Sequence, residues 1–298
     1  MSAAASTPSD DREAFARLLT DLRPKLHRYC ARMTGSAIHG EDVLQDAALR
    51  ALEAFTQSAP IHNPEGWLFR IAHNAALDFL RRQARSQRLA VDEDPDMVAG
   101  AEETDRRQLA AASLSTFMWL PPSQRSSVIL MDVLGYSLEE IGDVTSLSIP
   151  AIKAALHRGR TRLRELAGQA DELPLPVLAE AERARLQLYV NRFNARDFDA
   201  VRDMLADDVR LDLVNRMQRA GKRQVANYFT NYDGIAGWRF APGLVEGRPG
   251  ALVYDDAAGA DRPGYFVLLD WSGDRILKIR DFRYASYVFA EAEFVALP

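Results

Sequence analysis

The chain has 298 residues, a formal net charge of −5 and a single cysteine. This length exceeds that of a usual single domain, so two or three domains are expected. The polar N-terminal sequence MSAAASTPSDDR lacks the apolar core of a secretory signal, and no segment approaches the roughly 18 apolar residues of a membrane helix. Cys30 alone excludes an intrachain disulfide and fits a reducing compartment, so we expect a cytoplasmic protein without membrane contact.

Composition breaks divide the chain. Residues 91–110 hold seven acidic and two basic side chains, include Pro and Gly, and lack helical periodicity, which is typical of a flexible linker. A second linker is predicted at 168–178, because Pro174 and Pro176 stand two residues apart. The three domains predicted from these breaks span residues 10–90, 111–167 and 179–298.

The periodicity of apolar residues also changes along the chain. Between residues 10 and 85, and again between 108 and 166, apolar residues recur three and four apart, as amphipathic helices require. Two more helical stretches run to about residue 205, and alternating segments typical of strands follow. Five such segments begin at Asp208, Trp238, Ala251, Gly264 and Arg275, and a helix is expected near 221–231. The predicted fold is multidomain, with two all-α domains followed by an α+β domain.

Residues 137–166 predict a helix, a short turn and a second helix. Ser137 and Glu140 have the spacing of a capping box, while Ser148 and Pro150 have the positions expected at the start of the second helix. The apolar stripe of the second helix consists of Ile149, Ile152, Leu156 and Leu163.

The side of this helix away from the stripe combines small residues with cations. Its members are Ala151, Ala154, Ala155, Arg158 and Arg162, with Lys153 and Arg160 beside them. Small residues permit close approach to DNA and cations neutralise phosphates, so we predict a recognition helix for the major groove. A solvated cationic face on a structural helix is the alternative.

A second cationic helix is predicted from Asn63, as the N-cap, to Arg88, with Pro64 in the first helical position. Its inward-facing residues are Trp67, Ile71, Ala75 and Phe79, and its polar stripe carries Arg70, Asn74, Arg81 and Arg85, joined by His73 and Arg82. Such a stripe suits the backbone of an unpaired DNA strand. Cations that merely complement the helix dipole are the alternative.

The motifs in this order resemble the sigma-70 family of bacterial transcription initiation factors. The resemblance rests on EDVLQDAALRALEAF, NPEGWLFRIAHNAALDFLRR and the run from LPPSQR to LREL, and it covers about residues 10–167. More narrowly, the chain is similar to the extracytoplasmic-function (ECF) group, which keeps only the second and fourth sigma domains. The resemblance implies a non-enzymatic factor that binds core RNA polymerase and promoter DNA.

The resemblance also implies roles for individual residues. The helix with Asp42, Gln45, Asp46 and Leu49 would dock on the polymerase. The loop 56–63, with His62 and Asn63, would capture a flipped base of the minus-ten element, which costs a few kcal/mol of unstacking. The melted strand would be held by His73, Asn74, Arg81 and Arg82, beside Arg85. Arg125 matches a family position at the start of the fourth domain, and the acidic linker would thread toward the polymerase active site.

Contacts to the minus-thirty-five element are assigned by the same resemblance to Lys153, Ala154, Ala155, Arg158, Arg160 and Arg162. The family commonly has a Ser–Arg pair where this chain has Ala154 and Ala155. The contacts here would therefore rely on methyl groups and the neighbouring cations, and no promoter sequence is carried over from relatives.

Residues 179–298 resemble the SnoaL-like, ketosteroid-isomerase-type cone in element order and in the opening "D…A…DDV". ECF sigma factors with this extension form subgroups in which the extension modulates activity. A subgroup motif, DGGGK, is replaced here by NRMQRAGKRQ, so the details of that regulation are not carried over. The expected partners of the extension are a small ligand or a protein.

Catalysis by the extension is the alternative. All five histidines precede residue 170 and the extension has no cysteine, which removes the usual acid–base residue and soft metal ligands. A carboxylate in an apolar cavity, as in ketosteroid isomerase, is still an option. Its candidates are Asp212, Asp270 and Asp281 with Tyr228, Tyr265 and Tyr284, although Asp212 has the alternation of a solvent-facing residue. We predict no catalytic residue, metal or cofactor.

Two rival classes of protein follow from the same residues. One is an isomerase- or cyclase-like enzyme fused to a DNA-binding head, and the other is a helix-turn-helix repressor that acts without polymerase. Residues 41–88 argue against both, because neither class needs a polymerase-docking helix or a basic melting helix.

Overall fold

The computed structural model describes residues 8–55, 61–88, 113–167, 178–234, 236–255 and 262–298. The chain divides into two units, residues 1–171 and 172–298, and each is described by itself. Among the helices of the described ranges, none combines the length and the apolar character needed to cross a membrane.

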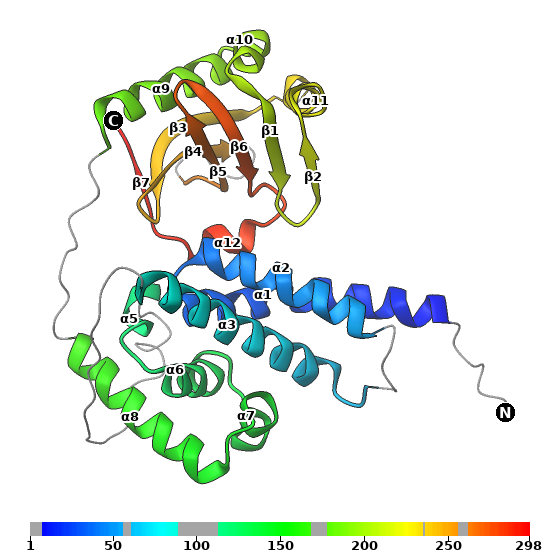
Figure 1. Cartoon of the computed structure of the whole chain (residues 1–298), viewed down its shortest axis with the longest axis vertical. Helices are drawn as coiled ribbons and strands as arrows, with labels where there is room; N and C mark the ends of the chain where they lie inside the picture. Colours follow the sequence, from blue (N-terminus) through cyan, green and yellow to red (C-terminus); the bar gives the residue numbers. More distant parts are fainter. Residues whose placement is uncertain (1–7, 56–60, 89–112, 168–177, 235, 256–261) are drawn as a thin grey trace. The chain divides into compact units, whose positions relative to one another are not determined.

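The first unit opens with three long helices that pack on one another, α1 (Pro8–Thr34), α2 (Ala37–Phe55) and α3 (Pro64–Arg88) (Figure 1). The predicted cap of α3 is confirmed, because the Asn63 side chain accepts a hydrogen bond from the Gly66 N–H at 3.0 Å. Tyr29, Cys30 and Phe69 are fully buried between these helices. Burial raises the pKa of the Cys30 thiol, so this cysteine has the environment of a packing residue.

The rest of the first unit is also helical. Its elements are α5 (Leu114–Phe117), α6 (Pro122–Val128), the π-helical turn η1 (Ile129–Val133), α7 (Leu138–Thr145) and α8 (Ile149–Ala167). The capping box of Ser137 and Glu140 is formed in both directions, and the Ser148 hydroxyl accepts from the Ala151 N–H at 3.4 Å. Both helix starts were predicted, and both are confirmed. Ser146, at φ 62°, ends α7 in the left-handed conformation and so turns the chain into α8.

The second unit is built on a seven-stranded sheet. In chain order its strands are β1 (Leu205–Leu213), β2 (Met217–Ala220), β3 (Trp238–Val245), β4 (Arg248–Asp255), β5 (Tyr265–Ser272), β6 (Arg275–Asp281) and β7 (Phe294–Ala296). The spatial order is β2-β1-β6-β5-β4-β3-β7, and only the β1–β6 pair is parallel. The five predicted strands are present. Two strands were not predicted from the sequence: β2, which is exposed along its length, and β7, which has only three residues.

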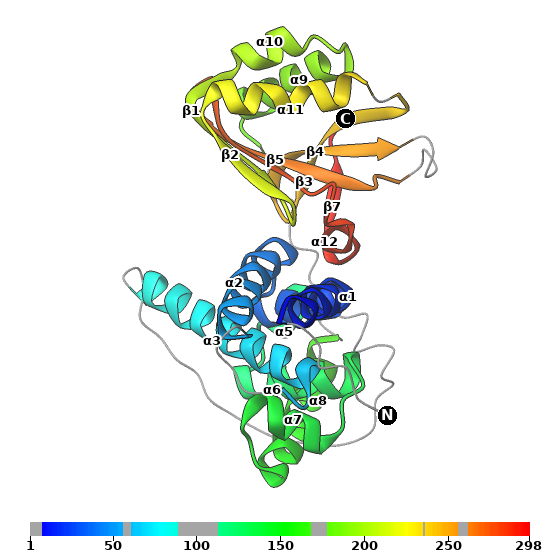
Figure 2. The same ribbon diagram turned by 90° about the vertical axis from the view of Figure 1, so that its right-hand side faces the viewer.

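Helices cover one face of this sheet. In Figure 2, α9 (Glu180–Asn194), α10 (Phe198–Asp203) and α11 (Lys222–Asp233) lie on the same side of the strands, and α12 (Ser286–Glu291) follows β6. The Asn194 side chain ties α9 to β3, because it donates to the Phe240 carbonyl and accepts from the Phe240 N–H, both at 2.9 Å. The core between the helices and the sheet centres on the fully buried Phe193.

Candidate nucleic-acid and protein interfaces

The outer face of α2 combines acids with an exposed leucine. Asp42 is exposed, Gln45 and Asp46 are half-buried, and the Leu49 side chain is 57% exposed. Other residues of α2 are buried in the core, among them Val43, Leu44, Ala47, Ala48 and Ala51. A helix with one face in the core and an exposed leucine among acids on the other face is suited to protein docking.

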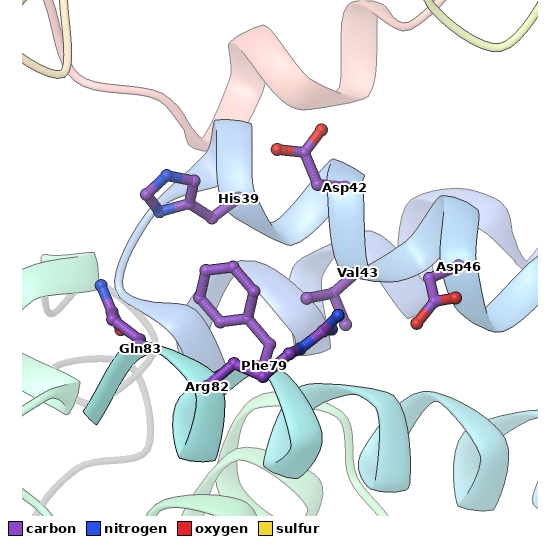
Figure 3. Close-up of a pocket in the computed structure, with 7 residues that line it drawn as sticks. All are labelled: His39, Asp42, Val43, Asp46, Phe79, Arg82 and Gln83. Atoms are coloured by element: carbon purple, nitrogen blue, oxygen red, sulfur yellow. The ribbon is translucent and has the colours of Figure 1, made fainter. Parts of the chain in front are cut away.

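A groove separates α2 from α3 on this side. Its volume is about 530 Å³, and it is lined by His39, Asp42, Val43, Asp46, Phe79, Arg82 and Gln83 (Figure 3). The His39 and Phe79 rings lie 5.3 Å apart between centroids and join the two helices. The groove brings together Asp42 and Asp46, expected at the polymerase, and Arg82, expected at DNA. The two predicted interfaces are therefore adjacent.

The C-terminal half of α3 presents a cationic surface. Asn74, Arg81, Arg82 and Arg85 are exposed, as are His62 and Asn63 before the helix. Asp78 forms ion pairs with Arg81 and with Arg50, each at 3.1 Å. The Arg50 hydrogen bond is the main cause that lowers the pKa of Asp78. Residues 56–60 of the predicted base-capturing loop lie outside the described residues.

His73 differs from the prediction. Its side chain is only 5% exposed, and its Nδ1 atom is hydrogen-bonded to the Tyr29 hydroxyl at 2.7 Å. Burial lowers the pKa of His73 to about 4, and the charge of Arg81 acts in the same direction. A neutral imidazole inside the helical core does not reach a DNA strand, so the structure assigns His73 to packing instead.

The second predicted cationic helix is α8. Lys153, Arg158 and Arg162 are exposed on it, and Ala154 is half-buried, which leaves one face open to a ligand. Arg162 also forms an ion pair with Glu165 at 3.1 Å. The apolar stripe is buried except at its first residue, since Ile149 is 39% exposed.

The structure also contradicts the predicted DNA contacts of two residues of α8, Ala155 and Arg160. Ala155 is only 2% exposed, so its methyl group belongs to the core and is not available to thymine. Arg160 donates from Nε and Nη2 to the two carboxylate oxygens of Asp132, at 2.9 and 2.6 Å. This fork fixes Arg160 to η1, so it supports the helix and does not extend toward DNA. The helical period of the sequence places both residues near the cationic face, but it does not indicate that Asp132 lies beside Arg160.

Side-chain contacts join the helices α1–α3 of the first unit to its helices α5–α8. The Tyr136 hydroxyl donates to Glu65 Oε1 at 2.7 Å, and Lys25 pairs with the same oxygen at 2.6 Å. Lys25 also lies 4.4 Å from the centroid of the Tyr136 ring. Arg70 Nε donates to the Asp143 carbonyl at 2.8 Å, so part of α3 contacts α7. Nothing in the sequence indicated these partners.

Arg125 is the buried link between the same two groups of helices. Its guanidinium donates to the Met33 carbonyl in α1, and to the Met118 and Leu120 carbonyls at 3.1 and 2.8 Å. Burial lowers the pKa of Arg125 to about 10. Gly35 lies next to this contact at φ 72°. A larger residue would not fit there, because its Cβ atom would lie 2.4 Å from Met118 Cγ.

In the second unit, the three candidate acids have different environments. Asp270 is exposed. Asp212 is 8% exposed and pairs with Arg280 at 3.3 Å, so it does not face solvent as its alternation indicated. Asp281 is buried at the end of β6, where the hydroxyls of Tyr228 and Tyr232 each donate to its Oδ2 at 2.7 Å. Tyr284 is 45% exposed, and the Arg216 guanidinium lies over its ring at 5.0 Å from the centroid.

The first unit thus has two exposed cationic helix faces, one on α3 and one on α8, and α7 and α8 form a helix-turn-helix like that of helical transcription factors. Family models for Sigma-70 region 2 and Sigma-70, region 4 match residues 18–86 and 119–163. The ECF RNA polymerase sigma factor SigM of Mycobacterium tuberculosis is 34% identical over 161 residues, which cover 53% of this chain and 79% of SigM.

Similarity also extends beyond the helical unit. The ECF RNA polymerase sigma factor SigG of Mycobacterium tuberculosis is 26% identical over 304 residues, which cover 90% of this chain and 81% of SigG. The crystal structure of the extracytoplasmic function sigma factor SigJ from the same organism is 20% identical, with a TM-score of 0.36, and covers 89% of this chain and 95% of SigJ. The chain belongs to the ECF RNA polymerase sigma factors. The predicted family and the order of two helical domains before an α+β domain are confirmed.

Proposed function

We propose that this sigma factor binds core RNA polymerase through the outer face of α2, and promoter DNA through α3 and α8. It acts in the cytoplasm, catalyses no reaction of its own, and is modulated by residues 179–298. The observation that carries the proposal is the presence of two separate exposed cationic helix faces in a chain of this family.

The polymerase contact is assigned to Asp42, Gln45, Asp46 and Leu49. Leu49 supplies apolar area that is worth about 25 cal/mol per Å² when a partner covers it, and the acids beside it favour a cationic partner surface. The groove between α2 and α3 continues this face toward Arg82, so docking and strand capture would take place side by side.

The minus-ten contact is assigned to His62, Asn63, Asn74, Arg81, Arg82 and Arg85. All six side chains are exposed. Each phosphate neutralised by an arginine releases condensed counterions, so this face would give strand binding a steep dependence on salt concentration.

The minus-thirty-five contact is assigned to Lys153, Ala154, Arg158 and Arg162. Arg158 can supply the bidentate contact to guanine that a recognition helix uses most often. Lys153 and Arg162 stand beside it and would hold phosphates.

Transcription with purified core polymerase and genomic promoter fragments tests this function directly. Arg81→Ala combined with Arg82→Ala should weaken promoter melting, seen as reduced permanganate reactivity of unpaired thymines, and should leave core binding intact. The matched control is Arg12→Ala with Arg17→Ala, which removes the same charge from the exposed side of α1. Equal footprints in both double variants would refute the assignment of α3. Absence of any promoter-specific transcript with active core would refute the function.

A further inference from the structure

A short basic segment at the edge of the second unit's sheet has no role in the function proposed above. It is the stretch NRMQRAGKRQ, residues 215–224, which forms the turn after β1, strand β2 and the start of α11. These ten residues hold four basic side chains and no acidic one, whereas residues 169–298 hold 17 basic and 20 acidic side chains. Positive charge is therefore concentrated here, in a part of the chain that is acidic overall.

The four cations, which we call the basic edge, are Arg216, Arg219, Lys222 and Arg223. The three arginines are exposed and Lys222 is half-buried. Strand β2 stands at one end of the described sheet and pairs only with β1 (Figure 1). Gly221, at φ 85°, turns the chain directly from β2 into α11, so the cations of the helix follow those of the strand without an intervening loop.

Neighbouring acids do not neutralise the basic edge. Asp212, on the adjacent strand β1, pairs with Arg280 at 3.3 Å, and the first turn of α11 contains no acid. Asp207 and Asp208 are exposed on β1. Within the described residues, neither of them forms an ion pair with the four cations. The charge of the basic edge is thus available to an anionic partner.

The arrangement of Arg216 favours phosphates over unpaired bases. Its guanidinium lies 5.0 Å from the centroid of the Tyr284 ring, and Asn215 donates to the Tyr284 carbonyl at 3.4 Å. A guanidinium that is already stacked loses less side-chain freedom when it binds an anion. A surface for unpaired bases presents free aromatic rings, whereas this ring already carries an arginine.

The length of the basic edge suits the backbone of a duplex. A strand rises about 3.3 Å per residue, so the chain advances roughly 15–20 Å from Arg216 to Lys222. Each strand of duplex DNA presents one phosphate per about 3.4 Å of helix axis, which gives about five phosphates over that length. Cations in such a row can contact several phosphates of one strand at once.

The covalent chain keeps the second unit close to any DNA that α8 binds. Ten residues lie between Ala167, the last residue of α8, and Leu178. Even fully extended, this stretch spans at most about 40 Å. A phosphate backbone is therefore present at high effective concentration whenever α8 occupies a promoter.

We propose that the basic edge binds the phosphate backbone of duplex DNA beside the minus-thirty-five element. The contact is independent of base sequence, because cations on phosphates position a protein and do not read bases. The inference rests on the proposed function, since α8 must first bring the promoter within reach. The second unit thus adds salt-dependent affinity to the promoter complex.

The test measures promoter affinity by fluorescence anisotropy for holoenzymes made with the full-length chain. The promoter fragment carries several helical turns of duplex upstream of the minus-thirty-five element. Loss of two phosphate contacts lowers the salt exponent by about two. The affinity of Arg216→Ala combined with Arg219→Ala should therefore fall about tenfold less than that of wild type between about 50 and 200 mM KCl.

Three further double variants sharpen the result. Lys222→Ala with Arg223→Ala should give the same reduction, and Arg216→Lys with Arg219→Lys should keep the wild-type salt dependence, because lysine keeps the charge. The matched control is Arg239→Ala with Arg262→Ala, which removes two exposed cations from β3 and from the residues before β5. This control should also keep the wild-type salt dependence.

Equal salt dependence in wild type and both alanine variants of the basic edge would overturn the inference. An equal reduction in the control would also overturn it, because the effect would then come from the charge of the whole unit. Weaker binding to core polymerase without DNA, at unchanged salt dependence on the promoter, would assign the basic edge to an acidic protein surface instead. Failure of the wild-type holoenzyme to form any promoter complex would refute the sigma function itself, whereas the other results refute only this inference.

Discussion

His73 is a histidine that folding keeps neutral. Its pKa falls from the ordinary 6.5 to about 4 because burial disfavours the imidazolium form. Between pH 4 and pH 6.5, His73 is therefore protonated in the unfolded chain and neutral in the folded chain. The free energy of unfolding should decrease as pH falls from 6.5 to 4, by up to about 3 kcal/mol from this residue alone.

Urea unfolding at pH 7 and pH 4.5 measures this effect. His73→Gln should lower stability at pH 7 and should show a smaller loss between the two pH values than wild type. His62→Gln replaces an exposed histidine and should keep the wild-type loss. Identical pH dependence in wild type and His73→Gln would show that other groups cause the acid sensitivity.

Arg158 and Arg160 are two residues apart and should behave oppositely. Arg160→Ala removes the guanidinium from Asp132, whose side chain is fully buried. We expect a loss of about 2–3 kcal/mol, less than for a fully buried pair because Arg160 is 31% exposed. Arg158→Ala should change stability by less than about 0.5 kcal/mol.

Promoter binding should show the reverse pattern. Arg158→Ala should alter the preference among minus-thirty-five variants, because a bidentate base contact is worth about 1–3 kcal/mol of discrimination. Arg160→Ala should lower affinity for all variants by the same factor. A uniform loss with Arg158→Ala, measured by fluorescence anisotropy on a promoter series, would place Arg158 at the phosphates.

At the scale of elements, helix caps were predictable because their causes are local, whereas the predicted linkers 91–110 and 168–178 lie almost wholly outside the described residues. Asn63, Ser137 and Ser148 each serve an amide within three residues, so spacing alone identified the helix starts. Ala155 and Arg160 were misassigned because their environment depends on elements distant in sequence. The helical period distinguishes the buried face of α8 from its exposed face. It does not show which neighbouring element covers the residues that lie between the two faces.

Arg125 governs how the elements of the first unit pack. Arg125→Ala would leave the carbonyls of Met33, Met118 and Leu120 without this donor, which should cost on the order of 3 kcal/mol. Since Arg125 joins α1 to α6, the α3–α7 contact should also loosen. Hydrogen exchange should then accelerate in α7 relative to α2, and Arg70 should be released from Asp143.

Arg125→Lys is the control for this change, because lysine keeps the charge but lacks the fork that reaches three carbonyls. It should give an intermediate increase in α7 exchange. If α7 exchange is unchanged in Arg125→Ala while overall stability falls, the residue acts only within its own helices.

For the whole molecule, the order of domains was predictable because periodicity changes from helical to alternating near residue 205. The central strands were predicted because their apolar alternation is strong, and β2 was missed because all four of its residues are exposed. The Asp281 cluster could be foreseen only as separate acids and tyrosines. Pairing Tyr228 and Tyr232 with Asp281 requires the fold that brings α11 against the end of β6.

The chain divides into two compact units, so a truncation between them tests the proposed regulation. The hydrophobic cluster around Phe193 consists of residues of the second unit alone, so removal of this unit should leave the first one folded. The proposed regulatory role then predicts that a chain ending at Ala170 binds core polymerase normally. Its promoter-dependent transcription should nevertheless differ several-fold from that of the full chain.

Tethering explains why such an effect should be lost on truncation. A short linker gives the attached unit an effective concentration on the order of millimolar, so weak contacts are populated. Separately purified residues 179–298, added at micromolar concentration, should therefore fail to restore full-length behaviour, whereas cleavage within 171–178 of the intact protein should reproduce the truncation. Multi-round transcription with core affinity measured in parallel distinguishes the cases. Equal transcription by the full-length and truncated chains at equal core affinity would show that the second unit does not modulate sigma activity.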